Sequence, residues 1–130
     1  MKEKTILVVE DNALNRELVT DLLTLAGLRV LMAVDAEMGL DLAAREAVDL
    51  VLMDVSLPRM DGLAATQLLK NNPATANVPV IALTAHAMKG DRERILAAGC
   101  DGYLTKPIDT RSFVESVLRF FPTGSPAPLS

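Results

Sequence analysis

The chain has 130 residues, half of them hydrophobic, which is enough for one well-filled core and too few for two. Its net charge of -4 argues against nucleic-acid binding, since contact with a phosphate backbone calls for clustered lysine and arginine. The single cysteine, Cys100, cannot form an internal disulfide, residues 1–4 precede no signal-peptide core, and no apolar run approaches the ~20 residues of a membrane-spanning helix. We therefore expect one cytoplasmic domain without nucleic-acid or membrane partners.

Short β-branched runs alternate along the chain with longer segments of helical period, as expected of repeated βα units around a parallel sheet. The predicted strands are residues 5–10, 29–33, 50–54, 80–84 and 102–105. Of the predicted helices, the first ends near residue 26, the second spans 36–45, the third ends near residue 71 and the fourth spans 89–98. A last helix begins at Pro107 and Asp109 and carries Phe113, Val117 and Phe121. Gly27 supplies the left-handed position that commonly stops a helix.

The second predicted strand is less apolar than the first and third, which suits an edge of the sheet. This favours an α/β fold with a doubly wound five-stranded parallel sheet in the order 2-1-3-4-5, flavodoxin-like and three-layered. We expect the domain to occupy residues 1–121 and residues 122–130, rich in Pro, Gly, Ser and Ala, to form a flexible tail. Three methionines, Met32, Met38 and Met53, fit core packing.

Unusual polar residues gather where the predicted strands end. Glu10 and Asp11 close the first strand, Asp54 closes the third, Thr84 closes the fourth and Lys106 follows the fifth. In an open parallel sheet these strand ends line the crevice where ligands bind. The three acids should therefore converge.

Three neighbouring carboxylates repel one another, which raises their pKa values unless a cation neutralises them. Oxygen ligands without Cys or His suit Mg²⁺, and Mn²⁺ can substitute. One screened acid can then attack phosphorus and form an acyl phosphate, and Asp54 is the best placed. Lys106 and Thr84 would supply the cation and hydroxyl that neutralise phosphoryl oxygens.

At this point the residues match a known family. The chain resembles the receiver domains of two-component response regulators, of the chemotaxis-regulator type, over residues 4–121. Any one of the motifs alone would be weak, but five in the right order are a strong signal. The motifs are Val9-Glu10-Asp11-Asn12, Leu52-Met53-Asp54, Leu57-Pro58-Arg59-Met60-Asp61-Gly62, Leu83-Thr84-Ala85 and Lys106-Pro107.

The resemblance implies that a histidine kinase or histidine phosphotransfer protein phosphorylates Asp54. It implies that Glu10, Asp11 and Asp54 hold Mg²⁺ together with the Ser56 backbone carbonyl. It further implies a response regulator or phosphorelay receiver that changes its partner-binding surface, with self-catalysed transfer and slow autodephosphorylation rather than enzymatic turnover.

Further roles follow from the same resemblance. Thr84, Ala85 and Lys106 would bind the phosphate, and Thr84 would move toward it while Tyr103 swings inward. The bond before Pro107 would be cis. Ser56 and His86 would flank the phosphate and tune its lifetime.

Two stretches, Asp11-Asn12-Ala13-Leu14-Asn15 and Thr84-Ala85-His86-Ala87-Met88, narrow the subfamily. They are similar to receivers in hybrid-kinase phosphorelays and in stand-alone regulators of the cell-cycle type. The sequence leaves open a stand-alone protein or a domain of a larger one, a monomer or a phosphorylation-dependent dimer, and the identities of kinase and target.

Simpler interpretations compete with these. Each acid alone could be a solvated helix cap, Thr84 an ordinary strand residue, Tyr103 a sheet-edge aromatic, and His86 a surface-loop histidine. An aspartyl-nucleophile phosphatase or mutase would carry a second acid two residues after the nucleophile, where this chain has Ser56.

A flavodoxin-like cofactor binder would need a first loop that accepts phosphate, where this chain presents two acids. A degenerate receiver that serves only as a docking module ranks last, because every expected chemical position is filled.

Overall fold

The structure is a computed structural model, and it describes residues 3–85 and 88–121. One parallel sheet runs through the middle of the domain, with the strand order β2-β1-β3-β4-β5. Its strands are β1 (Thr5–Val9), β2 (Arg29–Ala33), β3 (Leu50–Asp54), β4 (Val80–Thr84) and β5 (Gly102–Thr105). The predicted doubly wound order is confirmed, and β2 is an edge strand as its lower apolar content indicated.

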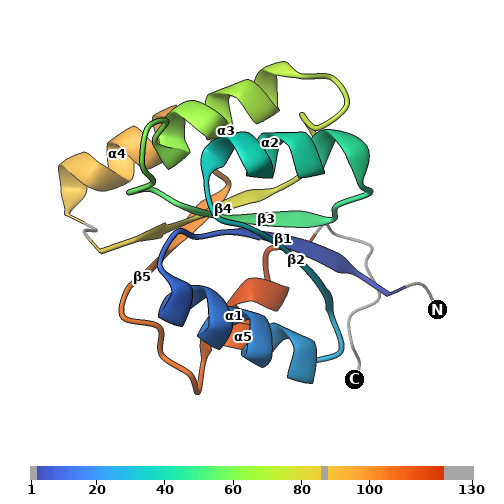
Figure 1. Cartoon of the computed structure of the whole chain (residues 1–130). Helices are drawn as coiled ribbons and strands as arrows, with labels where there is room; N and C mark the ends of the chain where they lie inside the picture. The colour runs from blue at the N-terminus through green and yellow to red at the C-terminus, as the bar shows by residue number, and fades with distance from the viewer. Residues whose placement is uncertain (1–2, 86–87, 122–130) are drawn as a thin grey trace.

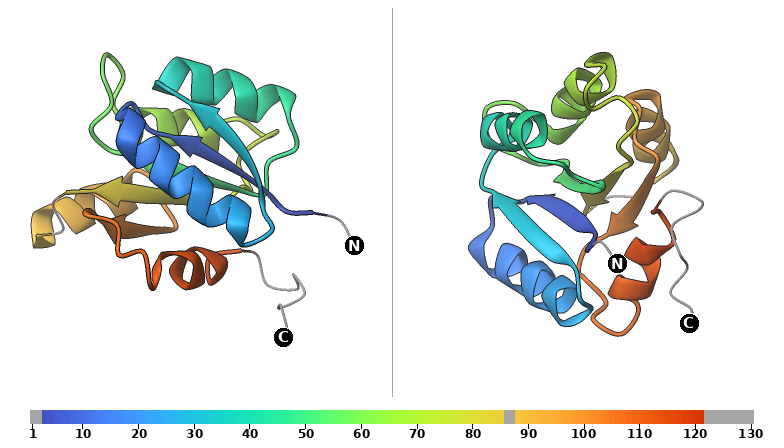
Figure 2. Two further views of the ribbon diagram at one scale, coloured as in Figure 1. Left: turned by 60° about the horizontal axis from the view of Figure 1, so that its bottom comes forward. Right: turned by 90° about the vertical axis from the view of Figure 1, so that its right-hand side faces the viewer.

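Helices cover both faces of this sheet (Figure 1). The helices are α1 (Ala13–Leu25), α2 (Ala36–Arg45), α3 (Gly62–Asn71), α4 (Lys89–Ala97) and α5 (Phe113–Leu118). Figure 2 shows α1 and α5 together on one face, while α2, α3 and α4 lie on the other. The three-layer arrangement follows from the right-handed crossover of each βα unit.

Each face of the sheet has its own hydrophobic core. Val9 and Met53 pack toward α2, α3 and α4, in a cluster that includes Ile95 of α4. Val8 and Leu52, one position along the same strands, pack on the opposite face with Phe113 of α5. Successive side chains of a strand alternate between faces, so a central strand covered on both sides is apolar throughout.

Short polar side chains start the helices close to the strand ends. Asn12, Asp35 and Asp61 are the N-caps of α1, α2 and α3, and each side chain accepts a hydrogen bond from the backbone N–H three residues later at 2.8–2.9 Å. This is the standard way to satisfy free N–H groups at a helix start. At the other end of α1, Gly27 has a φ of 91° and turns the chain into β2.

Two expectations were wrong. The last helix begins at Phe113 and not at Pro107 or Asp109. Asp109 starts a separate turn, in which its carboxylate accepts a hydrogen bond from the Arg111 N–H and its carbonyl accepts from the Phe113 N–H at 2.9 Å. Met32 and Met38 are each 46% exposed, whereas Met53 is buried. Met32 lies on the edge strand β2, where the helix layer leaves its side chain partly exposed. Among the described residues, no helix is long and apolar enough to cross a bilayer.

Candidate functional site

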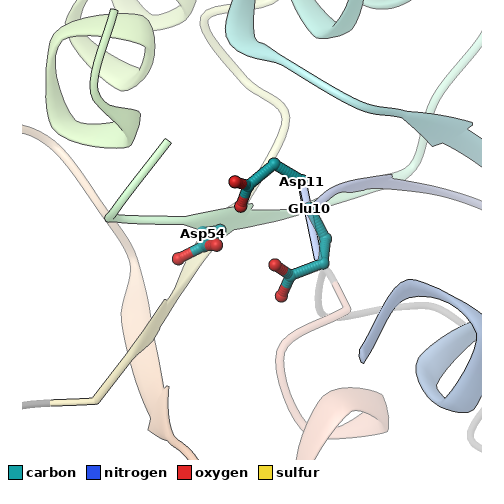
Figure 3. A group of neighbouring side chains, drawn as sticks. All are labelled: Glu10, Asp11 and Asp54. Carbon is teal, nitrogen blue, oxygen red and sulfur yellow. The ribbon is translucent and has the colours of Figure 1, made fainter. Parts of the chain in front are cut away.

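Three carboxylates meet at the edge of the sheet where β1 and β3 end. Asp54 is the last residue of β3, and Glu10 and Asp11 follow directly after β1. One carboxylate oxygen from each residue lies within 4.8 Å of the other two, as Figure 3 shows. Glu10 and Asp54 are buried, with exposed fractions of 0% and 2%, whereas Asp11 is exposed. The convergence predicted from the sheet order is present.

Lys106 is the cation of this cluster. Its Nζ lies 3.1 Å from Glu10 Oε1 and 3.2 Å from Asp54 Oδ2. Burial lowers the pKa of Lys106, but its contacts with Glu10 and Asp54 outweigh burial and hold that pKa above the ordinary value. One ammonium cannot balance three carboxylates, so the pocket retains a surplus of negative charge.

Burial and the neighbouring acid both act on Glu10, whose pKa is raised to about 7. Burial is the largest cause, followed by the neighbouring Asp54, while the hydrogen bond that Glu10 Oε2 accepts from the Asn12 N–H at 3.1 Å opposes them. Glu10 Oε1 is buried, and its polar contact among the described residues is the ion pair with Lys106 Nζ at 3.1 Å. A buried carboxylate oxygen in this state favours a cation ligand.

The donor set fits a hard divalent cation. The clustered ligand atoms are carboxylate oxygens, and they come from Glu10, Asp11 and Asp54. Mg²⁺ prefers such ligands and keeps part of its water shell, which the exposed Asp11 side leaves room for. The carbonyl of Ser56 comes from the loop that follows Asp54, and it accepts no hydrogen bond from the described residues. These residues therefore fit Mg²⁺ on chemical grounds.

Backbone and side-chain hydrogen bonds hold the loops that carry the cluster. Arg16 Nη1 donates to the Glu10 carbonyl at 2.9 Å and lies 3.4 Å from that of Asp11. The Ser56 N–H donates to Asp54 Oδ1 at 3.0 Å, which orients the carboxylate. Contacts within the chain itself therefore position both loops of the pocket.

The remaining predicted residues surround this cluster. Thr84 is buried at the end of β4, and its carbonyl accepts a hydrogen bond from the Lys106 N–H at 2.8 Å. Ala85 follows it and is exposed. Tyr103 lies on β5 beside Ala82 of β4 and packs, partly buried, against the core that α2, α3 and α4 cover.

Two other predictions concern the nearby loops. The peptide bond between Lys106 and Pro107 is cis, the isomer that the resemblance implies. His86 lies outside the described residues, as does the predicted tail at 122–130.

Two arginines near the pocket were not singled out from the sequence. Arg16 lies in the first part of α1, six residues after Glu10 and five after Asp11, a proximity that could have suggested a contact with their backbone. Arg59 stands inside a quoted motif but adopts a φ of 65°, and its side chain pairs with acids from a distant part of the chain. Sequence spacing gives no signal for such a contact.

Comparison with known proteins gives a consistent result. The family described as "Response regulator receiver domain" matches residues 6–118. The polar-differentiation response regulator DivK of Brucella anthropi is 43% identical over 114 residues, which cover 88% of this chain and 93% of DivK.

Solved structures agree on the fold. The receiver domain of the sensor histidine kinase PA1611 from Pseudomonas aeruginosa PAO1, with a magnesium ion coordinated in its active site cleft, is 37% identical. It has a TM-score of 0.84 and covers 92% of this chain and 98% of its own. The chemotaxis protein CheY4 of Vibrio cholerae has a TM-score of 0.88 at 24% identity, covers 92% of this chain and 100% of its own, and supports the fold alone.

Proposed function

Because the chain belongs to the response regulator receiver family, we propose that Asp54 is the residue on which it accepts a phosphoryl group. One observation carries this assignment. Asp54 ends the central strand β3, is 2% exposed, and has Lys106 Nζ 3.2 Å from Oδ2, with carboxylate oxygens of Glu10 and Asp11 within 4.8 Å. Of the two buried acids that contact Lys106, Asp54 is the one that belongs to a strand, the central β3.

The metal site in this proposal consists of Glu10, Asp11, Asp54 and the Ser56 carbonyl. When bound there, Mg²⁺ would offset the negative charge of the acids and of the phosphoryl oxygens, and Mn²⁺ can take its place. The Glu10 proton, held by a pKa of about 7, would have to leave before the carboxylate could bind a cation. The related receiver with a magnesium ion in its cleft supports this assignment.

The transfer itself needs little chemistry from the chain. A carboxylate oxygen of Asp54 forms a bond to phosphorus while the bond from phosphorus to the donor nitrogen breaks, and its electron pair stays on the donor imidazole. Lys106, which pairs with the carboxylates, would then pair with the phosphoryl oxygens and stabilise their negative charge. The Thr84 hydroxyl and the Ala85 N–H would contact the same oxygens. The contacts of Lys106 Nζ with both buried acids put it within reach of that position.

We further propose that Thr84 and Tyr103 convert this charge change into a surface change. Phosphorylation adds roughly 1.5 to 2 negative charges at pH 7 in a confined pocket. Thr84 ends β4, and Tyr103 lies on the adjoining strand β5 near the surface. A shift of the Thr84 loop toward the phosphate would leave room for the Tyr103 ring, so that two arrangements of β5 and its neighbours exchange population.

The donor in this proposal is a phosphohistidine, on a histidine kinase or a histidine phosphotransfer protein. A monomer and a phosphorylation-dependent dimer both agree with such a role. A phosphatase of the aspartyl-nucleophile class is disfavoured by Ser56, which provides no acid to protonate a leaving alcohol. The domain is thus a signalling module.

Intact-mass spectrometry after incubation with acetyl phosphate and Mg²⁺ tests the proposal. We expect one phosphoryl adduct on the natural chain, and none on Asp54→Asn or when EDTA removes the metal. Asp101→Asn is a matched control, since Asp101 is a paired acid beyond the end of α4 and its loss should leave the adduct intact.

Two results would contradict the assignment. An adduct that persists in Asp54→Asn would place the phosphoryl group elsewhere. Absence of an adduct with either metal, together with a folded chain, would favour a docking module without phosphorylation.

A further inference from the structure

The loop after β3 contains an unusual backbone conformation. Arg59 has a φ of 65°, and among the described residues it is the one non-glycine residue with a positive φ. L-amino acids with a side chain disfavour this region, which is normally left to glycine or asparagine. Such residues persist where surrounding contacts determine the conformation, and they concentrate near functional sites.

The contacts that hold Arg59 come from the start of α2. Its Nη2 lies 2.6 Å from Asp35 Oδ2 and 3.1 Å from Glu37 Oε1, and its Nε donates to Glu37 Oε1 at 3.3 Å. Asp35 Oδ1 is already engaged as the N-cap of α2. Asp35 therefore joins the helix start and the loop through its two oxygens.

The loop has few other anchors at this point. Among the described residues, the backbone of residues 57–60 forms no hydrogen bond to another part of the chain. The loop is fixed at its ends, where the Ser56 N–H donates to Asp54 Oδ1 and the Gly62 N–H donates to the Val55 carbonyl. Between them, the buried Leu57, the partly buried Met60 and the ion pairs of Arg59 hold the chain.

The position of Arg59 is transmitted to Ser56 because the segment between them is stiff. Pro58 has a fixed φ, and the residue before a proline, here Leu57, is restricted to extended conformations. Fixing Arg59 therefore limits the directions in which the Ser56 carbonyl can point. The Arg59 guanidinium is engaged by Asp35 and Glu37, so it acts on the loop and not as a second cation of the pocket.

We propose that Arg59, with Asp35 and Glu37, is a clasp that positions the metal-binding loop, so that breaking it weakens Mg²⁺ binding without unfolding the domain. The inference rests on the proposed function, since the Ser56 carbonyl is a ligand only in that assignment. Its contribution to global stability is small: exposed ion pairs are weak, and here they offset an unfavourable backbone conformation. Arg59 is thus a positioning residue that touches neither metal nor phosphate.

The test is a set of substitutions at Arg59 with calorimetric Mg²⁺ titration. Arg59→Gln removes the ion pairs of the clasp but keeps a side chain on a backbone with positive φ, which is the source of strain. Arg59→Gly removes both the ion pairs and the strain. We expect both to bind Mg²⁺ more weakly, by roughly tenfold, which is the low end for loss of a group that orients a ligand. Arg59→Lys should lie between them and the natural chain, because one ammonium can pair with Asp35 but lacks the fork that reaches Glu37.

Arg45→Gln is the matched control. It removes an Arg–Asp pair of 2.8 Å, but that pair joins Arg45 to Asp41 within α2 and does not reach the loop. Its Mg²⁺ affinity should equal that of the natural chain. A loss confined to Arg59→Gln and absent in Arg59→Gly would assign the effect to backbone strain and overturn the clasp.

A second readout needs no metal. Amide hydrogen exchange at Ser56 and Gly62 should accelerate in Arg59→Gln and in Asp35→Asn/Glu37→Gln, and combining these variants should add nothing further. Unchanged exchange and unchanged affinity would refute the clasp. If the natural chain neither binds Mg²⁺ nor takes a phosphoryl group, the proposed function fails, while these exchange rates still decide whether the clasp holds the loop.

Discussion

Gly62, the first residue of α3, lies against the backbone of Asp54, so that a β-carbon at position 62 would overlap the Asp54 carbonyl oxygen. The overlap is with main-chain atoms, which cannot turn aside as a flexible side chain can. The tight return of the chain from β3 to α3 therefore depends on hydrogen as the side chain of this residue. It also brings the loop of Ser56 back over the acid.

Gly62→Ala should displace the end of β3. We expect a loss of about 1–3 kcal/mol in the free energy of unfolding, as for overpacking in a core, together with slower phosphorylation by acetyl phosphate. Urea unfolding and timed intact-mass measurements would test both effects. Gly90→Ala in α4 is the control, because a β-carbon there meets nothing within 4 Å and alanine favours a helix.

Lys106→Met should leave two buried carboxylates without their cation. Removing one partner of such a pair destabilises a fold by about 3 kcal/mol or more, since the remaining charges lose their compensation. Mg²⁺ should recover part of this loss, because it binds the same oxygens. Thermal unfolding with and without Mg²⁺ measures the recovery.

Lys70→Met provides the comparison for that experiment. Lys70 Nζ pairs with Asp101 at 2.9 Å and donates to the Val78 carbonyl, near the start of β4 and away from the acid cluster. The variant should lose stability that Mg²⁺ does not restore beyond its effect on the natural chain. Equal recovery in the two variants would contradict a cation site beside Lys106.

Stability without metal should depend on pH through Glu10. Its pKa is about 7 in the folded protein against an ordinary value of 4.5, so the folded state holds the proton more tightly than the unfolded state. This contribution is fully present below pH 4.5 and is lost as pH rises through 7. The total change is roughly 3 kcal/mol at most.

Glu10→Gln removes that titration. In metal-free buffer, the stability of the variant relative to the natural chain should rise between about pH 5 and 7 and level off by about pH 8, in urea unfolding experiments at ~1 pH unit intervals. A constant difference over this range would show that Glu10 titrates normally. Adding Mg²⁺ should reverse the trend in the natural chain, because the ion binds the ionised form.

Substitution of Ser56 or His86 should change the lifetime of the phosphoryl group without abolishing phosphorylation. The Ser56 side chain is exposed, two residues after the buried Asp54. A larger side chain there should hinder water and slow hydrolysis. Loss of the phosphoryl adduct is followed by intact mass after the donor is removed, and unchanged rates in both variants would refute this role.

The fold could be predicted because several independent signals agreed. Strand β3 is apolar throughout since both of its faces are covered, and β2 is less apolar since it lies at the edge. The same reasoning placed Glu10, Asp54 and Lys106 together, because carboxyl ends of parallel strands share one edge.

The start of the last helix and the clasp were harder to predict for different reasons. Asp109 is a good N-cap residue, but the turn that it caps is a separate one, and the regular helix begins only at Phe113. Arg59 and Asp35 are 24 residues apart, and their contact depends on how two loops bend above the sheet. Periodicity describes strands and helices, and it carries no information on loop conformations of this kind.

The strand order has a consequence for when the pocket forms during synthesis of the protein. The pocket draws Glu10 from near the start of the chain and Lys106 from beyond the last strand, with β3 and β4 between them in the sheet. No fragment that ends before residue 106 contains the complete pocket. A growing chain on the ribosome should therefore be inert toward phosphodonors until β5 has joined the sheet, and a phosphoryl adduct would mark molecules in which all five strands have been made and have joined in the sheet.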